Sequence, residues 1–247
     1  MDRIRLIHDA PSAGPVNMAR DEALLALVGE RRSPPTLRLY QWREPTISLG
    51  YFQRFADYEA LPPPAGELPV VRRLTGGGAI LHDLELTYSL TVPLDHPLLH
   101  DGPNRLYEIA HDAIIAAIRA QELSPARCGV SDDSGAAKGP FFCFARRHCF
   151  DVLLDGAKLV GSAQRRTRHA VLQHGSIAVS NRFDQQPTAT LDMEFEGAVR
   201  ALRESLPRRL SELAGVELDA LNWTRDELDM SLALTAKYSG DAWTRRT

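Results

Sequence analysis

Apolar and polar residues alternate along the segment LELTYSLTV, which spans residues 84–92. Successive side chains of a β-strand point to opposite faces, so this period of two predicts a strand with one apolar and one polar face. The apolar positions are Leu84, Leu86, Tyr88, Leu90 and Val92, and the polar positions are Glu85, Thr87, Ser89 and Thr91. Such a strand is typical of an antiparallel or mixed sheet with one covered side.

Helical periodicity marks two other segments. In NMARDEALLALVGE, residues 17–30, apolar residues recur at helical spacing, and Asp21 and Glu22 favour the first turn. In PNRLYEIAHDAIIAAIRAQEL, residues 103–123, an apolar stripe follows Pro103, a residue that suits the start of a helix. We expect an amphipathic helix in each segment.

Three further stretches have the pattern of strands. PTLRLYQWREPTISLGYFQ contains two apolar runs rich in β-branched and aromatic residues, which predict two strands. DVLLDGAKLVGSA predicts a hairpin, because Asp155 and Gly156 suit a tight primed turn. HAVLQHGSIAVS predicts a strand in which Gly175 marks a bulge or the close approach of a ligand.

The whole chain, residues 1–247, is expected to form a single α/β or α+β domain, since no repeat or linker divides it. Its end is mostly helical from about residue 193, and Thr224 with Glu227 forms a capping box. Residues 124–142 lack periodicity and predict a long loop, a feature that is often functional in compact domains.

Charge and composition exclude several classes of protein. The formal charge of −3 gives no basic footprint for binding nucleic acid. No segment approaches the roughly 18 to 20 apolar residues of a membrane span, and no apolar leader follows the first charges, so we expect a cytoplasmic protein. Three cysteines in a chain of 247 residues are expected to be reduced thiols.

The triple glycine in RRLTGGGAILHD is the first candidate for chemistry. Glycines let backbone approach a ligand closely and expose N–H groups to an anion or a carbonyl. The loop is neither a dinucleotide nor a Walker motif, because a strand follows it instead of a helix. Charged groups crowd around it, namely Arg72, Arg73, His82 and Asp83, and favour a carboxylate, phosphate or acyl carbonyl over a mere strained turn.

Lys158, just after the hairpin turn, has three possible roles. Most lysines of this kind are solvated. Its neighbours in LVGSA are apolar or small, however, so a substrate could pack beside the ammonium. In such a pocket a lysine can lower its pKa and act as a base, or stay charged and hold an oxyanion.

The cysteines in FFCFARRHCFD leave four alternatives open: a metal pair, a disulfide, two inert core residues, or one nucleophile. Cys143, His148 and Cys149 lack the tight spacing of zinc ribbons, and no second cluster exists, which argues against zinc. Phe142 and Phe144 flank Cys143 and by themselves suggest a buried thiol. Cys149 is expected at the start of a strand, as packing.

Together these segments resemble the catalytic domain shared by lipoate–protein ligases, octanoyl transferases and biotin protein ligases. The matching stretches, in family order, are NMARDEALL, LRLYQWREPTISLGYFQ, VVRRLTGGGAILHDLELTYSL, GAKLVGSAQRR and QHGSIAVS. They are distributed over a span of about 165 residues, and the C-terminal helices carry no matching motif. The resemblance implies an α+β (α/β) fold with a mixed, largely antiparallel sheet flanked by helices.

Within this superfamily the chain is most similar to the octanoyl transferases typified by Gram-positive enzymes. Their segment C-F-x-x-x-S-x-Y-D precedes G-x-K-x-x-G-S-A-Q, so CFARRHCFD aligns Cys143 with the family nucleophile. His148 falls at the serine-like position and Phe150 at the tyrosine. The chain departs from the family in reading GGGA, as ligases do, where the transferases commonly read GGRA, and in replacing the usual Pro-Ser by Arg147 and His148.

The resemblance implies a ping-pong acyl transfer in which Cys143 and Lys158 are the catalytic residues. The octanoyl donor would be an acyl carrier protein thioester, and the acceptor a lysine of a lipoyl domain, such as the glycine-cleavage H protein or a 2-oxoacid dehydrogenase E2. No cofactor is required. The substrate-binding residues implied are Arg73, Thr75, Gly76, Gly77, Gly78, Ala79, His82, Gly161, Ser162, Ala163, His174, Gly175 and Ser176.

Other functions remain open at this point. An ATP-dependent lipoate–protein ligase would use ATP and Mg²⁺, with Arg73 and the glycine loop holding an acyl-adenylate. A lipoyl amidotransferase, or a carrier-binding protein without activity, would keep the same fold. The chain leaves no room for the additional domain of about 80 to 100 residues that many ligases carry, which favours the transferase.

Overall fold

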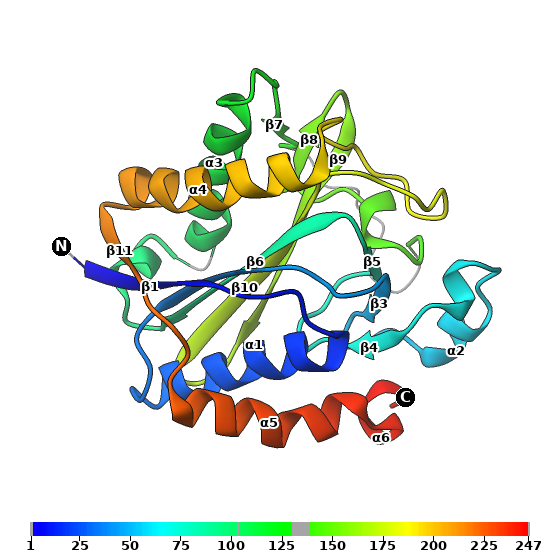
Figure 1. The fold of residues 1–247 in the computed structure, drawn as a ribbon, viewed down its shortest axis with the longest axis horizontal. Coiled ribbons are helices and arrows are strands. Elements are labelled where there is room, and N and C mark those ends of the chain that lie inside the picture. Colours follow the sequence, from blue (N-terminus) through cyan, green and yellow to red (C-terminus); the bar gives the residue numbers. More distant parts are fainter. Residues whose placement is uncertain (1, 103, 130–138, 247) are drawn as a thin grey trace.

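The computed structural model describes residues 2–102, 104–129 and 139–246, and its centre is an eight-stranded sheet (Figure 1). β1 lies parallel to its two neighbours, and all other adjacent strands are antiparallel. The expected mixed, largely antiparallel sheet flanked by helices is therefore confirmed. The strands, in spatial order, are β11 (Val216–Ala220), β1 (Asp2–His8), β2 (Thr36–Tyr40), β6 (Glu85–Pro93), β10 (Ala170–Ala178), β9 (Ala157–Arg166), β8 (Val152–Leu154) and β7 (Ala126–Arg127).

Helices cover both faces of this sheet (Figure 1). α3 and α4 pack on one face, and α1 and α5 pack together on the other. A second, three-stranded sheet of order β4-β3-β5 lies beside the first. The remaining elements are α1 (Gly14–Gly29), β3 (Thr46–Leu49), α2 (Phe55–Glu59), η1 (Ala65–Glu67), β4 (Val70–Arg72), β5 (Ile80–His82), η2 (Pro97–Leu99), α3 (Arg105–Arg119), η3 (Cys143–Ala145), α4 (Phe195–Ala214), α5 (Arg225–Ser239) and α6 (Asp241–Thr244).

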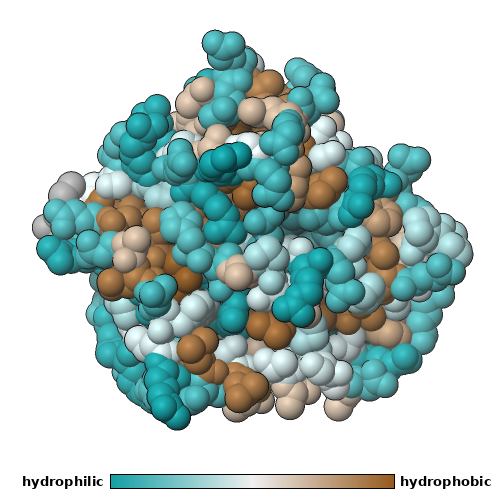
Figure 2. Space-filling model, in the orientation of Figure 1, coloured by the Kyte–Doolittle hydropathy of each residue, from teal (hydrophilic) through white to brown (hydrophobic). Residues whose placement is uncertain are grey.

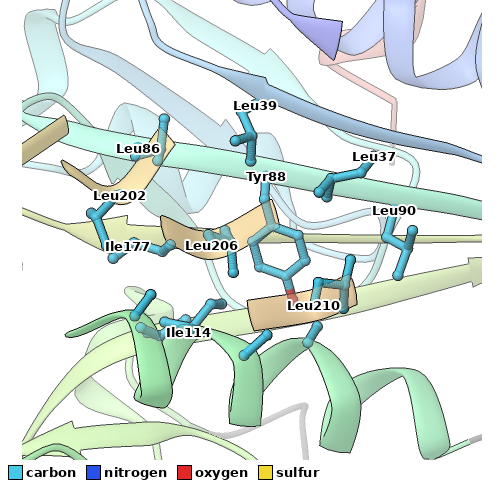
Figure 3. Close-up of a cluster of buried hydrophobic side chains, with 14 of the residues drawn as sticks. Leu37, Leu39, Leu86, Tyr88, Leu90, Ile114, Ile177, Leu202, Leu206 and Leu210 are labelled. Atoms are coloured by element: carbon cyan, nitrogen blue, oxygen red, sulfur yellow. The ribbon is translucent and has the colours of Figure 1, made fainter. Parts of the chain in front are cut away.

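β6 is buried along its whole length, on both faces. Its apolar face packs against α3 and α4, where Tyr88 lies among leucines of both layers and Ile114 of α3 (Figure 3). The expectation of an uncovered polar face is wrong, because α1 and the small sheet cover that side. Glu85, Thr87 and Ser89 instead find hydrogen-bond partners inside the protein, whereas the buried Thr91 hydroxyl has none among the described residues.

Local turn and cap chemistry follows the sequence closely. The β8–β9 hairpin is confirmed, with φ of 50° at Asp155 and 79° at Gly156, the positive values that a primed turn needs. The capping box of Thr224 and Glu227 is also confirmed. Pro103, expected at the start of α3, lies outside the described residues.

The structure changes three details of the expected elements. α1 begins at Gly14, so Asp21 lies beyond its first turn and serves a buried ion pair instead of the helix dipole. The strand that follows the glycine loop is the short β5 of the small sheet, and the chain enters the large sheet at β6, after a break around Asp83. β10 pairs in continuous register through Gly175, without a bulge.

Strand β1 and the edge strand β11 beside it have no counterpart among the expected elements. Each is short and rich in charged residues, and they pair with each other across almost the whole chain. Arg5 of β1 is 3% exposed and is paired with Glu227 of α5, whose carboxylate also accepts a hydrogen bond from Ser33. This ion pair joins α5 to the edge of the sheet.

Hydrophilic side chains cover most of the face shown in Figure 2, and the apolar side chains on it form separate patches. Among the described residues, no helix has the length and apolar character needed to cross a membrane. The apolar surface of the protein is instead concentrated between the layers, in the cluster shared by the large sheet, α3 and α4.

We predict that Glu227→Ala lowers the free energy of unfolding by about 3–5 kcal/mol, because it leaves the buried Arg5 guanidinium without its carboxylate. Equilibrium urea unfolding followed by circular dichroism would measure the loss. Asp229→Ala, on the exposed side of the same helix, should change stability by no more than about 0.5 kcal/mol. Equal losses of stability in Glu227→Ala and Asp229→Ala would contradict the stabilising role of the ion pair between Arg5 and Glu227.

Candidate active site

One buried arginine sets the shape of the glycine loop between β4 and β5. Arg73 is 2% exposed, and all five of its N–H groups donate hydrogen bonds. Its Nη2 reaches the carbonyl oxygens of Gly76 and Gly78, each at 2.7 Å. Its other donors bind Ser48 and the Thr75 hydroxyl. Burial lowers the pKa of Arg73 to about 10, which leaves the guanidinium charged at neutral pH.

The backbone that precedes Cys143 crosses this loop at Gly78. The Ala79 N–H donates to the Phe141 carbonyl at 2.9 Å, and the Cys143 N–H donates to the Ala79 carbonyl at 2.7 Å. A Cβ on residue 78 would lie 2.9 Å from the Phe141 oxygen and 3.0 Å from the Cys143 nitrogen. In this structure a side chain at position 78 would displace the backbone of the Cys143 segment, which accounts for the third glycine of GGGA.

Cys143 begins the short helix η3 and faces Lys158 of β9. The Lys158 Nζ lies 3.6 Å from the Cys143 Sγ and 3.3 Å from the Cys143 carbonyl oxygen. Lys158 is 5% exposed, and the Asp151 carboxylate accepts a hydrogen bond from its ammonium at 2.8 Å. The structure thus brings the two expected catalytic residues together and adds a carboxylate that the sequence analysis did not single out.

The charge state of Lys158 follows from these neighbours. Burial alone lowers the pKa of Lys158, but a thiolate at Cys143 and the Asp151 carboxylate outweigh burial and raise that pKa above its ordinary 10.5. Lys158 is therefore an ammonium at neutral pH. The sequence left three roles open for Lys158. This environment fits the role in which the lysine is buried and stays charged.

Cys143 borders a mainly apolar cavity of about 450 Å³ when the open space at its mouth is included. Met18, Trp42 and Ile80 contribute to its apolar walls. The glycine loop forms one wall, and β9 with β10 forms another. Of the expected site residues, those that line the cavity are Arg73, Gly76, Gly77, His82, Cys143, Gly161, Ser162, Ala163, His174, Gly175 and Ser176.

An open groove adjoins the cavity at Cys143. Lys158, Asp151 and Tyr107 line the groove, together with Gly78. Ser162, Ala163, Cys143, Gly76 and Gly77 border both spaces. The thiol therefore lies at the junction of a partly enclosed apolar chamber and a wider polar approach.

Two of the expected substrate-binding residues line neither space. Thr75 is fully buried, and its hydroxyl lies 2.7 Å from His174 Nε2. Ala79 is fully buried in the backbone contact with the Cys143 segment. Both residues support the glycine loop from behind.

Buried ion pairs hold the cavity wall formed by α1. Asp21 bonds His174 Nδ1 at 3.0 Å and Arg38 at 2.8 Å. Burial raises the pKa of Asp21, but these two partners outweigh burial and hold the pKa below its usual value. His82 bonds Ser48 and Glu85 and stacks on the Trp42 ring, with centroids 3.9 Å apart.

Several residues of this region escaped the sequence analysis. Asp151 is the last residue of CFARRHCFD, the segment that resembles the family motif. Asp21 and Glu85 lie in patterns that indicated the first turn of a helix and the solvated face of a strand. Cys149 lies in a turn before β8, not at the start of a strand, and its Sγ is 3.9 Å from His148 Nδ1. Gly175 provides room for Ser162 Oγ, which a Cβ there would approach to 2.1 Å.

In the part of the chain that the structure describes, no group of three or more His, Cys, Asp or Glu side chains is arranged to hold a metal ion. Cys143, Cys149 and Cys128 form no disulfide bond. The segment around Cys143 is held by its contacts with Lys158 and with the glycine loop.

His111 of α3 is buried behind the groove. Its Nδ1 bonds the Phe150 carbonyl, and its Nε2 lies 2.7 Å from Ser162 Oγ. Burial is the main reason why the pKa of His111 falls to about 4. The imidazole is therefore neutral at pH 7.

Comparison with protein families matches residues 14–218 to the lipoyl protein ligase A/B catalytic domain. The chain belongs to this family. Two curated relatives are both octanoyltransferases LipM. The one from Kyrpidia tusciae is 33% identical over all of both chains. The one from Moorella thermoacetica is 36% identical over 98% of this chain and 97% of its own.

Solved structures share the fold. A lipoate-protein ligase A bound with ATP superposes with a TM-score of 0.74 and 21% identity, over 98% of both chains. A bi-partite lipoate protein ligase from Thermoplasma acidophilum gives a TM-score of 0.73 and 22% identity, over 99% of this chain and 97% of its own. The expected fold of the lipoate ligase type is therefore confirmed.

His111 makes stability depend on pH in a defined window. Its folded pKa of about 4 lies below the ordinary 6.5, so the unfolded chain binds the extra proton and stability falls as the pH drops from 6.5 towards 4. The free energy of unfolding should fall less between pH 7 and pH 5 in His111→Gln than in the wild type, by about 2 kcal/mol, because glutamine cannot titrate. Urea unfolding at the two pH values would measure this, with the exposed His169→Gln as the control. An unchanged loss in His111→Gln would refute the prediction.

Proposed function

We propose that the protein is an octanoyltransferase that acts in protein lipoylation. It moves an octanoyl group from an acyl carrier protein thioester to a lysine of a lipoyl acceptor domain, through an acyl-enzyme on Cys143. Membership of the family and the full-length octanoyltransferase relatives support the reaction class. The observation that carries the mechanism is the pairing of Cys143 with the buried ammonium of Lys158 at the mouth of an apolar cavity.

The first half-reaction exchanges one thioester for another. The Cys143 thiolate attacks the octanoyl carbonyl carbon and forms a C–S bond. The carrier C–S bond then breaks, and the carrier sulfur leaves with the electron pair and takes up a proton. Lys158 stabilises the attacking thiolate by its charge, 3.6 Å away, while Asp151 holds the ammonium in position.

The tetrahedral oxygen needs hydrogen-bond donors. Within the described part of the chain, the N–H groups of Gly76, Gly77 and Gly78 donate no hydrogen bond. They border the groove beside Cys143, as the Lys158 ammonium does. These groups, with the backbone of Gly161–Ala163, are the oxyanion donors in our proposal.

The octanoyl chain would occupy the apolar cavity. Met18, Trp42 and Ile80 offer apolar surface to an alkyl chain, and burying each methylene gains about 0.8 kcal/mol. The glycine loop, His82, and His174 to Ser176 would enclose it. The thioester carbonyl would remain at Cys143, at the edge of the cavity.

The second half-reaction gives the amide. The acceptor lysine attacks the octanoyl-Cys143 carbonyl from the open groove, and the more stable amide drives the cycle. The acceptor would be a lipoyl domain, such as the glycine-cleavage H protein or a 2-oxoacid dehydrogenase E2. This reaction needs no cofactor, since the donor is already activated.

An ATP-dependent lipoate–protein ligase, using ATP and Mg²⁺, is the alternative, and a lipoyl amidotransferase would use the same Cys143. In the ligase, Arg73 and the glycine loop would hold the acyl-adenylate. Here the five N–H groups of Arg73 are committed to the loop and its neighbours, so none is left for a phosphate or a carboxylate. The position of Cys143 also has no purpose in an adenylate mechanism. Both points favour the transferase.

Incubation with octanoyl acyl carrier protein should give an enzyme that carries one octanoyl group, detected by intact mass and removed by hydroxylamine. Cys143→Ala should abolish the adduct, because it removes the nucleophile, and Lys158→Met should slow its formation by about 100-fold or more. Cys149 lies in the turn before β8, so the Cys149→Ala variant should form the adduct at the wild-type rate.

The same assay separates the transferase from the ligase. Acceptor modification that requires ATP, releases pyrophosphate and persists in Cys143→Ala would overturn the proposal. Transfer from lipoyl-modified protein instead of the octanoyl carrier would assign the amidotransferase.

A further inference from the structure

Behind Ser162 lies a chain of hydrogen bonds in which the direction from donor to acceptor is the same at every link. Gln173 Nε2 lies 2.7 Å from the Tyr88 hydroxyl, which lies 2.8 Å from Ser162 Oγ. Ser162 Oγ lies 2.7 Å from His111 Nε2, and His111 Nδ1 bonds the Phe150 carbonyl. The chain therefore passes through the three side chains Tyr88, Ser162 and His111.

The two ends of the chain fix every proton in it. An amide nitrogen can only donate, so Tyr88 accepts from Gln173 and must give its own proton to Ser162. A carbonyl can only accept, so the proton of His111 is on Nδ1 and its Nε2 accepts from Ser162. The orientation of Gln173 is itself fixed, because its Nε2 also donates to the Leu106 carbonyl at 3.2 Å.

Ser162 is consequently left with one free acceptor position. Its proton points to His111, and one lone pair takes the Tyr88 proton. Ser162 is half-buried and borders both the cavity and the groove at Cys143. The remaining lone pair can serve a hydrogen-bond donor in the site but cannot serve an oxyanion.

The second half-reaction brings such a donor. A neutral primary amine attacks with its lone pair and keeps two N–H groups that need acceptors in a site partly closed to water. Lys158 cannot accept, because it is held as an ammonium by Asp151 and is committed to Cys143. The first half-reaction, in which a thiolate attacks, brings no N–H group to the carbonyl.

We propose that Ser162 is a catalytic residue for the aminolysis step alone, accepting a hydrogen bond from the attacking lysine amine, and that His111 and Tyr88 are its positioning residues. The amine nitrogen bonds to the carbonyl carbon, and the C–S bond to Cys143 breaks with its electron pair on sulfur. The proton lost by nitrogen ends on the Cys143 sulfur, so amine and thioester give amide and thiol. This inference rests on the proposed octanoyl transfer.

The neutrality of His111 supports the same assignment. Burial is the main cause of its low pKa, and the charges of Arg127 and Lys158 lower it further. With Nε2 unprotonated, the imidazole keeps Ser162 as an acceptor towards the groove throughout the neutral range. No part of the proposal requires His111 to take up a proton during the reaction.

The test measures the two half-reactions separately. Octanoyl acyl carrier protein is used to load the enzyme, and the rate of acyl-enzyme formation is followed by intact mass. The isolated acyl-enzyme is then mixed with an apo lipoyl domain, and the rate of octanoyl transfer is followed in the same way. Ser162→Ala should slow transfer by about 10- to 30-fold, the value of one hydrogen bond, and leave loading within about threefold of wild type.

His111 gives a matched pair of variants. His111→Leu removes the acceptor behind Ser162 and should slow transfer as Ser162→Ala does, while His111→Gln keeps an acceptor oxygen and should restore most of the rate. Tyr88→Phe keeps the ring and should also slow transfer selectively. The exposed His169→Gln, on the loop between β9 and β10, is the control for histidine replacement and should behave as wild type.

The outcomes are distinct. Slowing of loading and transfer to the same extent, or wild-type transfer in Ser162→Ala, would overturn the inference. Equal rates in His111→Leu and His111→Gln would remove His111 from it. A wild-type enzyme that forms no acyl-enzyme would instead reject the proposed function, and a variant that loads normally is by that measure folded.

Discussion

The need to satisfy polar groups inside the sheet is the constraint on which the rest of the structure depends. β6 passes through the centre of the protein with its polar face buried as deeply as its apolar face. Each polar atom there would cost about 1–3 kcal/mol if left without a partner. Ser89 is therefore tied to Asp21 of α1, Thr87 to the Trp42 indole, and Glu85 to His82 and Ser176. One strand thus fixes the positions of a helix, the small sheet and β10 around the same cavity.

The chemistry of the site depends on backbone contacts more than on side-chain reach. Ala79 makes one hydrogen bond to Phe141 and one to Cys143, and Gly78, which has no side chain, leaves room for this close approach. The loop on the other side of the contact is held by Arg73, with its full set of donors engaged. Main-chain bonds of this kind vary little, so thiol, ammonium and unpaired N–H groups stay in a common arrangement before a substrate arrives. Such preorganisation is what electrostatic stabilisation of an oxyanion requires.

The sequence predicts what is encoded locally and misses what is assembled across the chain. Two local signals were predicted correctly, because each acts over only two to four residues. They are the turn pair Asp155-Gly156 and the capping box of Thr224 and Glu227. The alternation at residues 84–92 revealed the strand but not its burial on both faces, because the covering residues lie elsewhere in the sequence. Asp21 was assigned to a helix dipole for the same reason, since nothing nearby indicates Arg38 or His174. The glycine loop and Lys158 were candidates from their own neighbours and the family resemblance selected Cys143 as the nucleophile, while the protons around Ser162 could be assigned only once Tyr88, His111 and Gln173 were seen together.

The ion pair between Arg5 and Glu227 also bears on the synthesis of the chain. Its partners are separated by 222 positions, so the first strand emerges from the ribosome roughly 10 to 40 s before its carboxylate exists. Until then Arg5 can be buried only at the cost of an unpaired charge, several kcal/mol, and it remains hydrated. β11, the parallel neighbour of β1, is translated just as late. The edge of the sheet that begins the sequence is therefore the last to be completed, and the nascent chain carries an unfinished strand for nearly the whole of its translation.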